Sequence, residues 1–146
     1  MELEPEGTTL VVGGSSGIGL ATARRILAQG RRVEIVGRNQ RKLDEAAADL
    51  RSLGSVECRR ADLRLDSDVA ELVSRISGSG RHYAALVNSA GTFVPKPFLD
   101  HGPEDYDAYH DLNRGVFRVT QAVARNMRDH GGGVIVNVGS MWAKQA

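Results

Sequence analysis

The chain has 146 residues, of which 41% are hydrophobic and 25% charged, so it suits one globular domain and excludes a disordered chain. Its formal net charge of +1 gives no electrostatic reason to expect a nucleic acid or an anionic membrane as partner. Its apolar runs are too short to span a bilayer, its one cysteine excludes an internal disulfide, and its acidic start lacks the features of a signal peptide, so we expect a cytoplasmic protein.

Apolar runs and helical spacing divide the chain into alternating strands and helices. In chain order the sequence predicts strand 8–13, helix 17–29, strand 32–36, helix 40–53, strand 56–61, helix 66–76, strand 83–88, helix 103–130 and strand 134–138. Strands that alternate with helices of this length favour a parallel sheet with helices on both faces. We therefore expect an α/β fold with a doubly wound Rossmann-type sheet of strand order 3-2-1-4-5, which binds ligands beyond the carboxyl ends of its strands.

A glycine-rich segment separates the first strand from the first helix. Gly13 suits a tight turn, Gly17 lets the backbone approach a pyrophosphate, and Gly19 lets the helix pack close to the strand. The positions between them hold Ser15, Ser16 and Ile18. The unpaired N–H groups at the start of the helix suit an anion, so the segment predicts a phosphate-binding loop. A tight turn without a ligand is the alternative.

The second strand is followed by Gly37, Arg38 and Asn39. An acidic residue here would accept hydrogen bonds from the ribose hydroxyls of NAD(H) and repel a 2′-phosphate, whereas a guanidinium can pair with phosphate. The segment therefore favours NADP(H), with NAD(H) as the alternative cofactor. In the other interpretation, Arg38 is a solvated side chain in a turn that Asn39 caps.

Two further strands end in residues that suit a dinucleotide. Asp62, followed by Leu63, could accept a hydrogen bond from the adenine amino group or could cap a turn, and the chemistry alone does not decide between them. Asn88, Ala90 and Gly91 follow the fourth strand, where small side chains would let a flat cofactor approach.

Five segments in order resemble motifs of the short-chain dehydrogenase/reductase family, in its simple single-domain type. They are the loop from Gly13 to Gly19, Asp62 with Leu63, the run from Asn88 to Gly91, Asn113, and the strand from Gly133 to Ser140. The chain departs from the family pattern at Val12, where threonine is usual, and at Ser89, where a second asparagine is usual.

The resemblance implies hydride transfer between a nicotinamide and a carbonyl or alcohol substrate, in a protein that forms a homo-oligomer. It implies that Ser140 hydrogen-bonds the reacting oxygen and that Asn113 supports a proton-relay water. The family's acid/base is a tyrosine beyond the serine with a lysine four residues later, and none of Tyr83, Tyr106 and Tyr109 fits that pattern.

We therefore expect residues 1–146 to form the NAD(P)-binding Rossmann domain of such an oxidoreductase, cut before the Tyr-x-x-x-Lys segment and inactive alone. A non-catalytic dinucleotide-binding module is the alternative. The four histidines lack metal-ligand spacing, so we expect no metal site.

Overall fold

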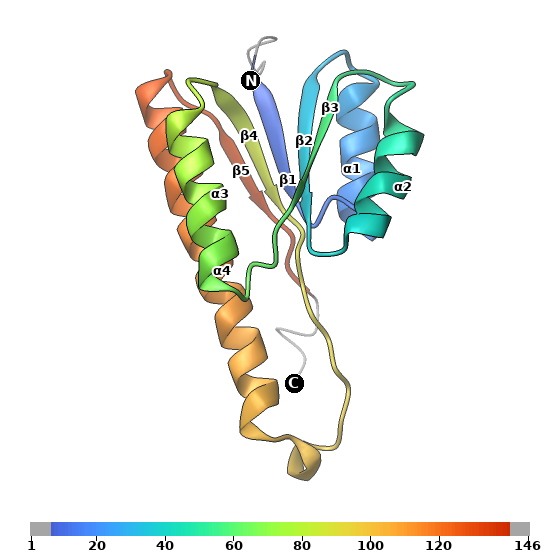
Figure 1. The fold of residues 1–146 in the computed structure, drawn as a ribbon, viewed down its shortest axis with the longest axis vertical. Coiled ribbons are helices and arrows are strands. Elements are labelled where there is room, and N and C mark those ends of the chain that lie inside the picture. Colours follow the sequence, from blue (N-terminus) through green and yellow to red (C-terminus); the bar gives the residue numbers. More distant parts are fainter. Residues whose placement is uncertain (1–6, 141–146) are drawn as a thin grey trace.

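The computed structural model describes residues 7–140, which form five strands, four α-helices and one short 3₁₀ helix (Figure 1). The strands are β1 (Thr8–Val12), β2 (Arg32–Gly37), β3 (Val56–Arg60), β4 (Tyr83–Asn88) and β5 (Val134–Asn137). The helices are α1 (Gly17–Leu27), α2 (Gln40–Leu50), α3 (Asp66–Gly78), α4 (Pro103–Asp129) and the 3₁₀ helix η1 (Phe98–Asp100). The predicted domain limits at 1 and 146 lie outside the described residues.

The five strands form one parallel sheet of order β3-β2-β1-β4-β5, which confirms the predicted strand order. Val12 is in register with Asn88, and Asn88 with Asn137, so three strands end side by side at one edge of the sheet. The loops that follow these strands therefore meet in one place, as expected for a doubly wound sheet.

Helices cover both faces of the sheet, as the sequence predicts (Figure 1). On one face, α3 and α4 pack over β1 and β4, with Leu10, Leu86 and Val123 fully buried between them. On the other face, α1 and α2 bury Leu27 and Leu43 against the sheet. Apolar side chains on both faces of the central strands account for their nearly continuous hydrophobic runs.

Several element boundaries differ from the prediction by a few residues. Strand β1 ends one residue early, because Gly13 has a φ of +82° and leaves the strand conformation. Helix α1 ends at Leu27. The Gly30 N–H donates to the Leu27 carbonyl at 2.9 Å, and this bond between residues three apart closes a 3₁₀-type turn rather than a further α-helical turn. Helix α3 runs two residues further, to Gly78, and η1 is not among the predicted elements.

The N-terminal half of α4 extends past the carboxyl ends of the strands (Figure 1). Its first turn is closed by Asp105, which accepts a hydrogen bond from the Gly102 N–H at 3.0 Å and forms an ion pair with Lys96 at 2.7 Å. Further along, Gly115 lies against the main chain of Leu63, so that α4 passes close to the loop after β3. No helix in the described part of the chain is both long and apolar enough to cross a membrane.

A fully buried carboxylate lies in the middle of β2. Glu34 accepts a hydrogen bond from the Tyr83 hydroxyl at 2.9 Å and lies 3.4 Å from the Arg81 guanidinium. Arg75 and Arg59 approach its other oxygen at 3.5 and 3.8 Å. Burial, and then the nearby carboxylate, raise the pKa of Tyr83, which keeps its hydroxyl a hydrogen-bond donor. The surrounding guanidinium groups offset the free-energy cost of burying the Glu34 carboxylate in the core.

The two outer strands differ in chemistry. Strand β3 carries Glu57, Arg59 and Arg60, whereas β5 carries the partly exposed apolar side chains Ile135 and Val136. Charged side chains protect a strand edge from unwanted pairing, and apolar ones do not.

Candidate functional site

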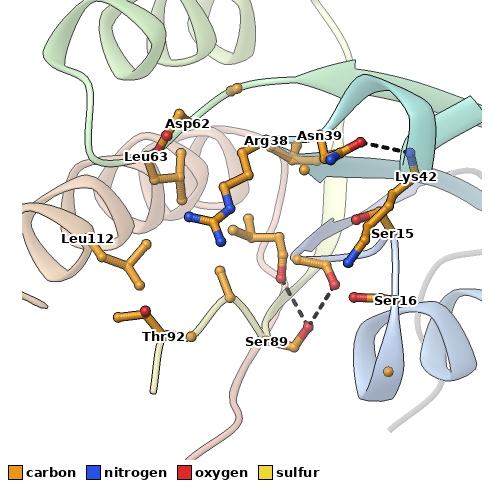
Figure 2. Close-up of a pocket in the computed structure, with 18 of the residues that line it drawn as sticks. Ser15, Ser16, Arg38, Asn39, Lys42, Asp62, Leu63, Ser89, Thr92 and Leu112 are labelled. Atoms are coloured by element: carbon orange, nitrogen blue, oxygen red, sulfur yellow. Dashed lines mark hydrogen bonds between the residues drawn. The ribbon is translucent and has the colours of Figure 1, made fainter. Parts of the chain in front are cut away.

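The carboxyl ends of β1, β2, β3 and β4 surround a pocket of about 390 Å³, within the range of small-molecule sites (Figure 2). Among its lining residues are these predicted cofactor contacts: Gly13, Ser15, Ser16, Gly17, Ile18, Arg38, Asn39, Asp62, Leu63, Ala90 and Gly91. Lys42, Arg64, Ser89, Thr92 and Leu112 also line it. The pocket thus collects residues from four loops that are far apart in the sequence.

The glycine loop shapes one wall of the pocket. A Cβ at Gly13 would lie 2.7 Å from the Ala90 backbone nitrogen, and the φ of +82° there disfavours any side chain. Gly17 has a φ of +53° and faces open space, so its backbone is accessible to a ligand. The N-cap of α1, Ser16, makes no side-chain capping bond, which leaves the N–H groups of the first turn for an anion.

Gly19 and Asn88 lie beneath the pocket rather than in its lining. A Cβ at Gly19 would collide with the Gly13 carbonyl and the Ser89 hydroxyl, so this glycine sets the close packing of α1 on the loop. Asn88 is buried and donates to Thr120 Oγ1 at 3.0 Å and to Asn137 Oδ1 at 2.8 Å. It ties β4 to α4 and β5, and so holds the floor of the site.

Cations line the pocket at the end of β2. Arg38 points into the pocket, and Asn39 caps α2 by accepting a hydrogen bond from the Lys42 N–H at 3.0 Å (Figure 2). The turn is thus capped by Asn39, and Arg38 is an exposed side chain that faces the pocket, while the preference for NADP(H) stays a prediction. A Cβ at Gly37 would come within 2.9 Å of the Ser15 hydroxyl, so a larger residue there would displace Ser15.

Asp62, which follows β3, is paired with Arg64. Its Oδ1 accepts hydrogen bonds from the Arg64 backbone N–H at 3.1 Å and from Arg64 Nε at 3.0 Å, while its Oδ2 accepts from Nη2 at 2.6 Å. The Arg64 hydrogen bond, more than any other cause, holds the pKa of the Asp62 carboxyl below its usual range. Asp62 thus caps a turn and lines the pocket at once.

The two residues expected to act on the substrate lie outside this lining. Asn113 is an exposed residue of α4, next to Leu112, which does line the pocket. Ser140 is exposed and follows β5 at the same edge of the sheet where β1 leads into Gly13. Their roles stay predictions.

Sequence reasoning missed some residues of the pocket. Lys42 looks like an ordinary surface charge, although its place one turn into a helix that starts at a strand end could have indicated the pocket. Arg64 stands two residues after Asp62. This is the spacing of a turn in which an aspartate carboxylate accepts a hydrogen bond from the backbone N–H two residues later. Ser89 donates to the Val12 carbonyl at 3.1 Å, a contact with no local signal (Figure 2).

Within residues 7–140, no three histidine, cysteine, aspartate or glutamate side chains are grouped so as to hold a metal ion. The charged side chains among the described residues of the pocket are Arg38, Lys42, Arg64 and Asp62, beside several serine, threonine and asparagine side chains.

Comparison with known proteins assigns the chain to a protein family. The family model for short chain dehydrogenase matches residues 7–146. The chain is 31% identical to the 3alpha-hydroxysteroid dehydrogenase of Mediterraneibacter gnavus, over 90% of this chain and 54% of that protein. It is 38% identical to a hexahydroindene-carboxyl-CoA reductase of Mycobacterium tuberculosis, over 96% of this chain and 56% of the relative.

Solved structures agree with these relatives. The short-chain dehydrogenase from Sphingobium yanoikuyae, in complex with NADPH, has a TM-score of 0.85 and 34% identity, over 92% of this chain and 54% of that one. The L-sorbose reductase from Gluconobacter frateurii, complexed with NADPH and L-sorbose, has a TM-score of 0.87 and 29% identity, over 99% and 57%. The chain spans little more than half the length of the relatives it matches. By sequence and by fold, it belongs to the short-chain dehydrogenase family.

Proposed function

We propose that the pocket binds NADP(H), in an oxidoreductase that transfers hydride between the nicotinamide and a carbonyl or alcohol substrate. The observation that carries the proposal is the end of β2, where Arg38 and Lys42 line the pocket and Gly37 leaves no acidic side chain. A guanidinium and an ammonium favour a 2′-phosphate. An acid at position 37, which would favour NAD(H), would also press on the Ser15 hydroxyl.

The remaining walls fit the rest of a dinucleotide. The open backbone at Gly17 and the uncapped first turn of α1 offer N–H donors to a pyrophosphate. Asp62 offers an acceptor at the end of β3. When bound, the nicotinamide would supply or accept the hydride. The solved relatives that are in complex with NADPH support this choice of cofactor.

For the reacting end of the site, we propose that Ser140 donates a hydrogen bond to the substrate oxygen and that Asn113 holds a water for proton transfer. Asn113 lies in the half of α4 that extends past the carboxyl ends of the strands, and Ser140 follows β5, which ends there (Figure 1). Turnover is proposed for the whole protein, since the chain spans little more than half the length of its relatives.

Cofactor titration into the purified protein tests the proposal. NADPH should bind more tightly than NADH, and Arg38→Ala should weaken NADPH about tenfold to hundredfold, the effect of losing a hydrogen bond to a charged group. NADH binding should change little. Arg41→Ala is the matched control, because Arg41 is highly exposed and pairs with Glu45 on α2. Equal losses for both cofactors, or a preference for NADH in the unaltered protein, would overturn the proposal.

A further inference from the structure

Asp62 is the single carboxylate among the described residues that line the pocket, and the cationic side chains of that lining are Arg38, Lys42 and Arg64. Phosphates would be attracted by the cations and repelled by the carboxylate, so a phosphate-rich ligand would contact Asp62 favourably only where it presents a hydrogen-bond donor. Adenine presents one such donor, its exocyclic 6-amino group. The Asp62 carboxylate can recognise that amino group only if its oxygens are held in a fixed direction.

The main chain around Asp62 is held independently of its side chain. The Asp62 N–H donates to Asp68 Oδ2 at 2.8 Å, and the Asp62 carbonyl accepts from the Leu65 N–H at 3.0 Å. Gly115 of α4 lies against Leu63 next to it. Because the backbone is fixed by these contacts, the direction of the carboxylate depends on the side-chain torsions, and Arg64 is the residue that sets them.

Arg64 leaves the carboxylate with little remaining capacity. A carboxylate has about four lone-pair positions, two on each oxygen. The Arg64 backbone N–H and Nε occupy two on Oδ1, and Nη2 occupies one on Oδ2. One acceptor position is left, on Oδ2. Bidentate pairing of this kind fixes geometry as well as charge.

We propose that Arg64 is a positioning residue, which turns the Asp62 carboxylate so that its one remaining lone pair on Oδ2 selects a 6-amino purine over a 6-oxo purine. The inference rests on the proposed NADP(H) site. An ionised carboxylate cannot donate a hydrogen bond, so a 6-oxo group would place acceptor against acceptor. Arg64 supports this rejection, because its hydrogen bonds lower the pKa of the Asp62 carboxyl and so favour the ionised form.

The test compares NADPH with its 6-oxo analogue, in which hypoxanthine replaces adenine, by the fluorescence of the reduced nicotinamide. The unaltered protein should bind NADPH at least about tenfold more tightly than the analogue. Arg64→Ala should weaken NADPH about tenfold and the analogue less than about twofold, so that the discrimination collapses. Arg64→Lys should not restore it, because an ammonium lacks the planar fork. Arg128→Ala is the control, since Arg128 is an exposed residue at the far end of α4.

Two further readouts separate positioning from simple charge. Asp62→Asn should lose the discrimination by itself, and the double variant Asp62→Asn/Arg64→Ala should lose no more. The discrimination should also survive to lower pH in the unaltered protein than in Arg64→Ala. Equal weakening of both ligands by Arg64→Ala, with recovery in Arg64→Lys, would mean that Arg64 only attracts phosphate and would overturn this inference alone. An unaltered protein that binds neither ligand would overturn the proposed function.

Discussion

Replacing Gly115 by alanine adds a methyl group where α4 passes the loop after β3. The new Cβ would lie 2.9 Å from both the carbonyl carbon and the Cβ of Leu63, and closer still to the Leu63 carbonyl oxygen. Backbone cannot rotate away as a flexible side chain can. Either α4 must move outward or the segment that carries Asp62 and Arg64 must shift.

Two opposing effects set the size of the change. Alanine gains about 1 kcal/mol over glycine in a helix interior. Overpacking costs about 1–3 kcal/mol, and contact with main chain on a buried face places this site at the upper end. The net expectation is a loss of about 2 kcal/mol in the free energy of unfolding. For a protein of this size, that corresponds to a fall in Tm of about 4–8 °C.

Thermal and urea unfolding of Gly115→Ala should show this loss, and NADPH binding should weaken with it because Leu63 lines the pocket. Gly78→Ala is the matched control. Gly78 ends α3, has no atom near its would-be Cβ and does not have a positive φ, so alanine there should be neutral or stabilising. If Gly115→Ala proved as stable as the original protein, the close approach of α4 to Leu63 would be refuted.

Three other changes are expected to have measurable effects. Tyr83→Phe removes a buried hydrogen bond to Glu34 and should cost about 1–3 kcal/mol in urea unfolding, and a loss below about 0.5 kcal/mol would contradict the buried network. Asn39→Ala removes the cap of α2 and should cost about 1 kcal/mol, whereas Asn39→Asp should retain most of the stability. Asp105 has its pKa lowered, first by the Lys96 hydrogen bond, so its contribution is present above the ordinary carboxyl pKa and is lost as pH falls through the lowered value. The hydrogen-exchange protection factors of residues 92–102, which are corrected for the intrinsic pH dependence of amide exchange, should therefore fall at acidic pH, and Asp105→Asn should lower them at neutral pH, while protection that is independent of both would argue against this anchor.

The sheet order and the glycine loop could be predicted because their signals are local. Alternating strands and helices admit few topologies, and Gly13 and Gly17 adopt backbone conformations that the glycine spacing already indicates. The position of Arg38 in the pocket follows in the same way, since a residue just after a parallel strand must lie at the carboxyl edge of the sheet.

Features that depend on distant partners could not be predicted. The burial of Glu34 cannot be predicted from its apolar neighbours in β2. The side chains that surround its carboxylate come from β3, from α3, and from β4 and the residues just before it. Asn88 belongs to a run that resembles a family motif. Its hydrogen-bond partners Thr120 and Asn137 lie on α4 and β5, far away in the sequence, so the motif does not predict them. The pairing of Arg64 with Asp62 depends on side-chain torsions, which no sequence pattern specifies.

The unequal edges of the sheet limit how copies of this fold could join. A sheet propagates into a fibre only when both of its edges accept a new strand. Pairing at β3 would disturb Arg59 and Arg60, which are engaged with Glu34 and Asp68, whereas β5 carries no such charges. Strand addition at β3 would therefore have to break ion pairs that the fold already uses, so this outer strand resists pairing with a second copy.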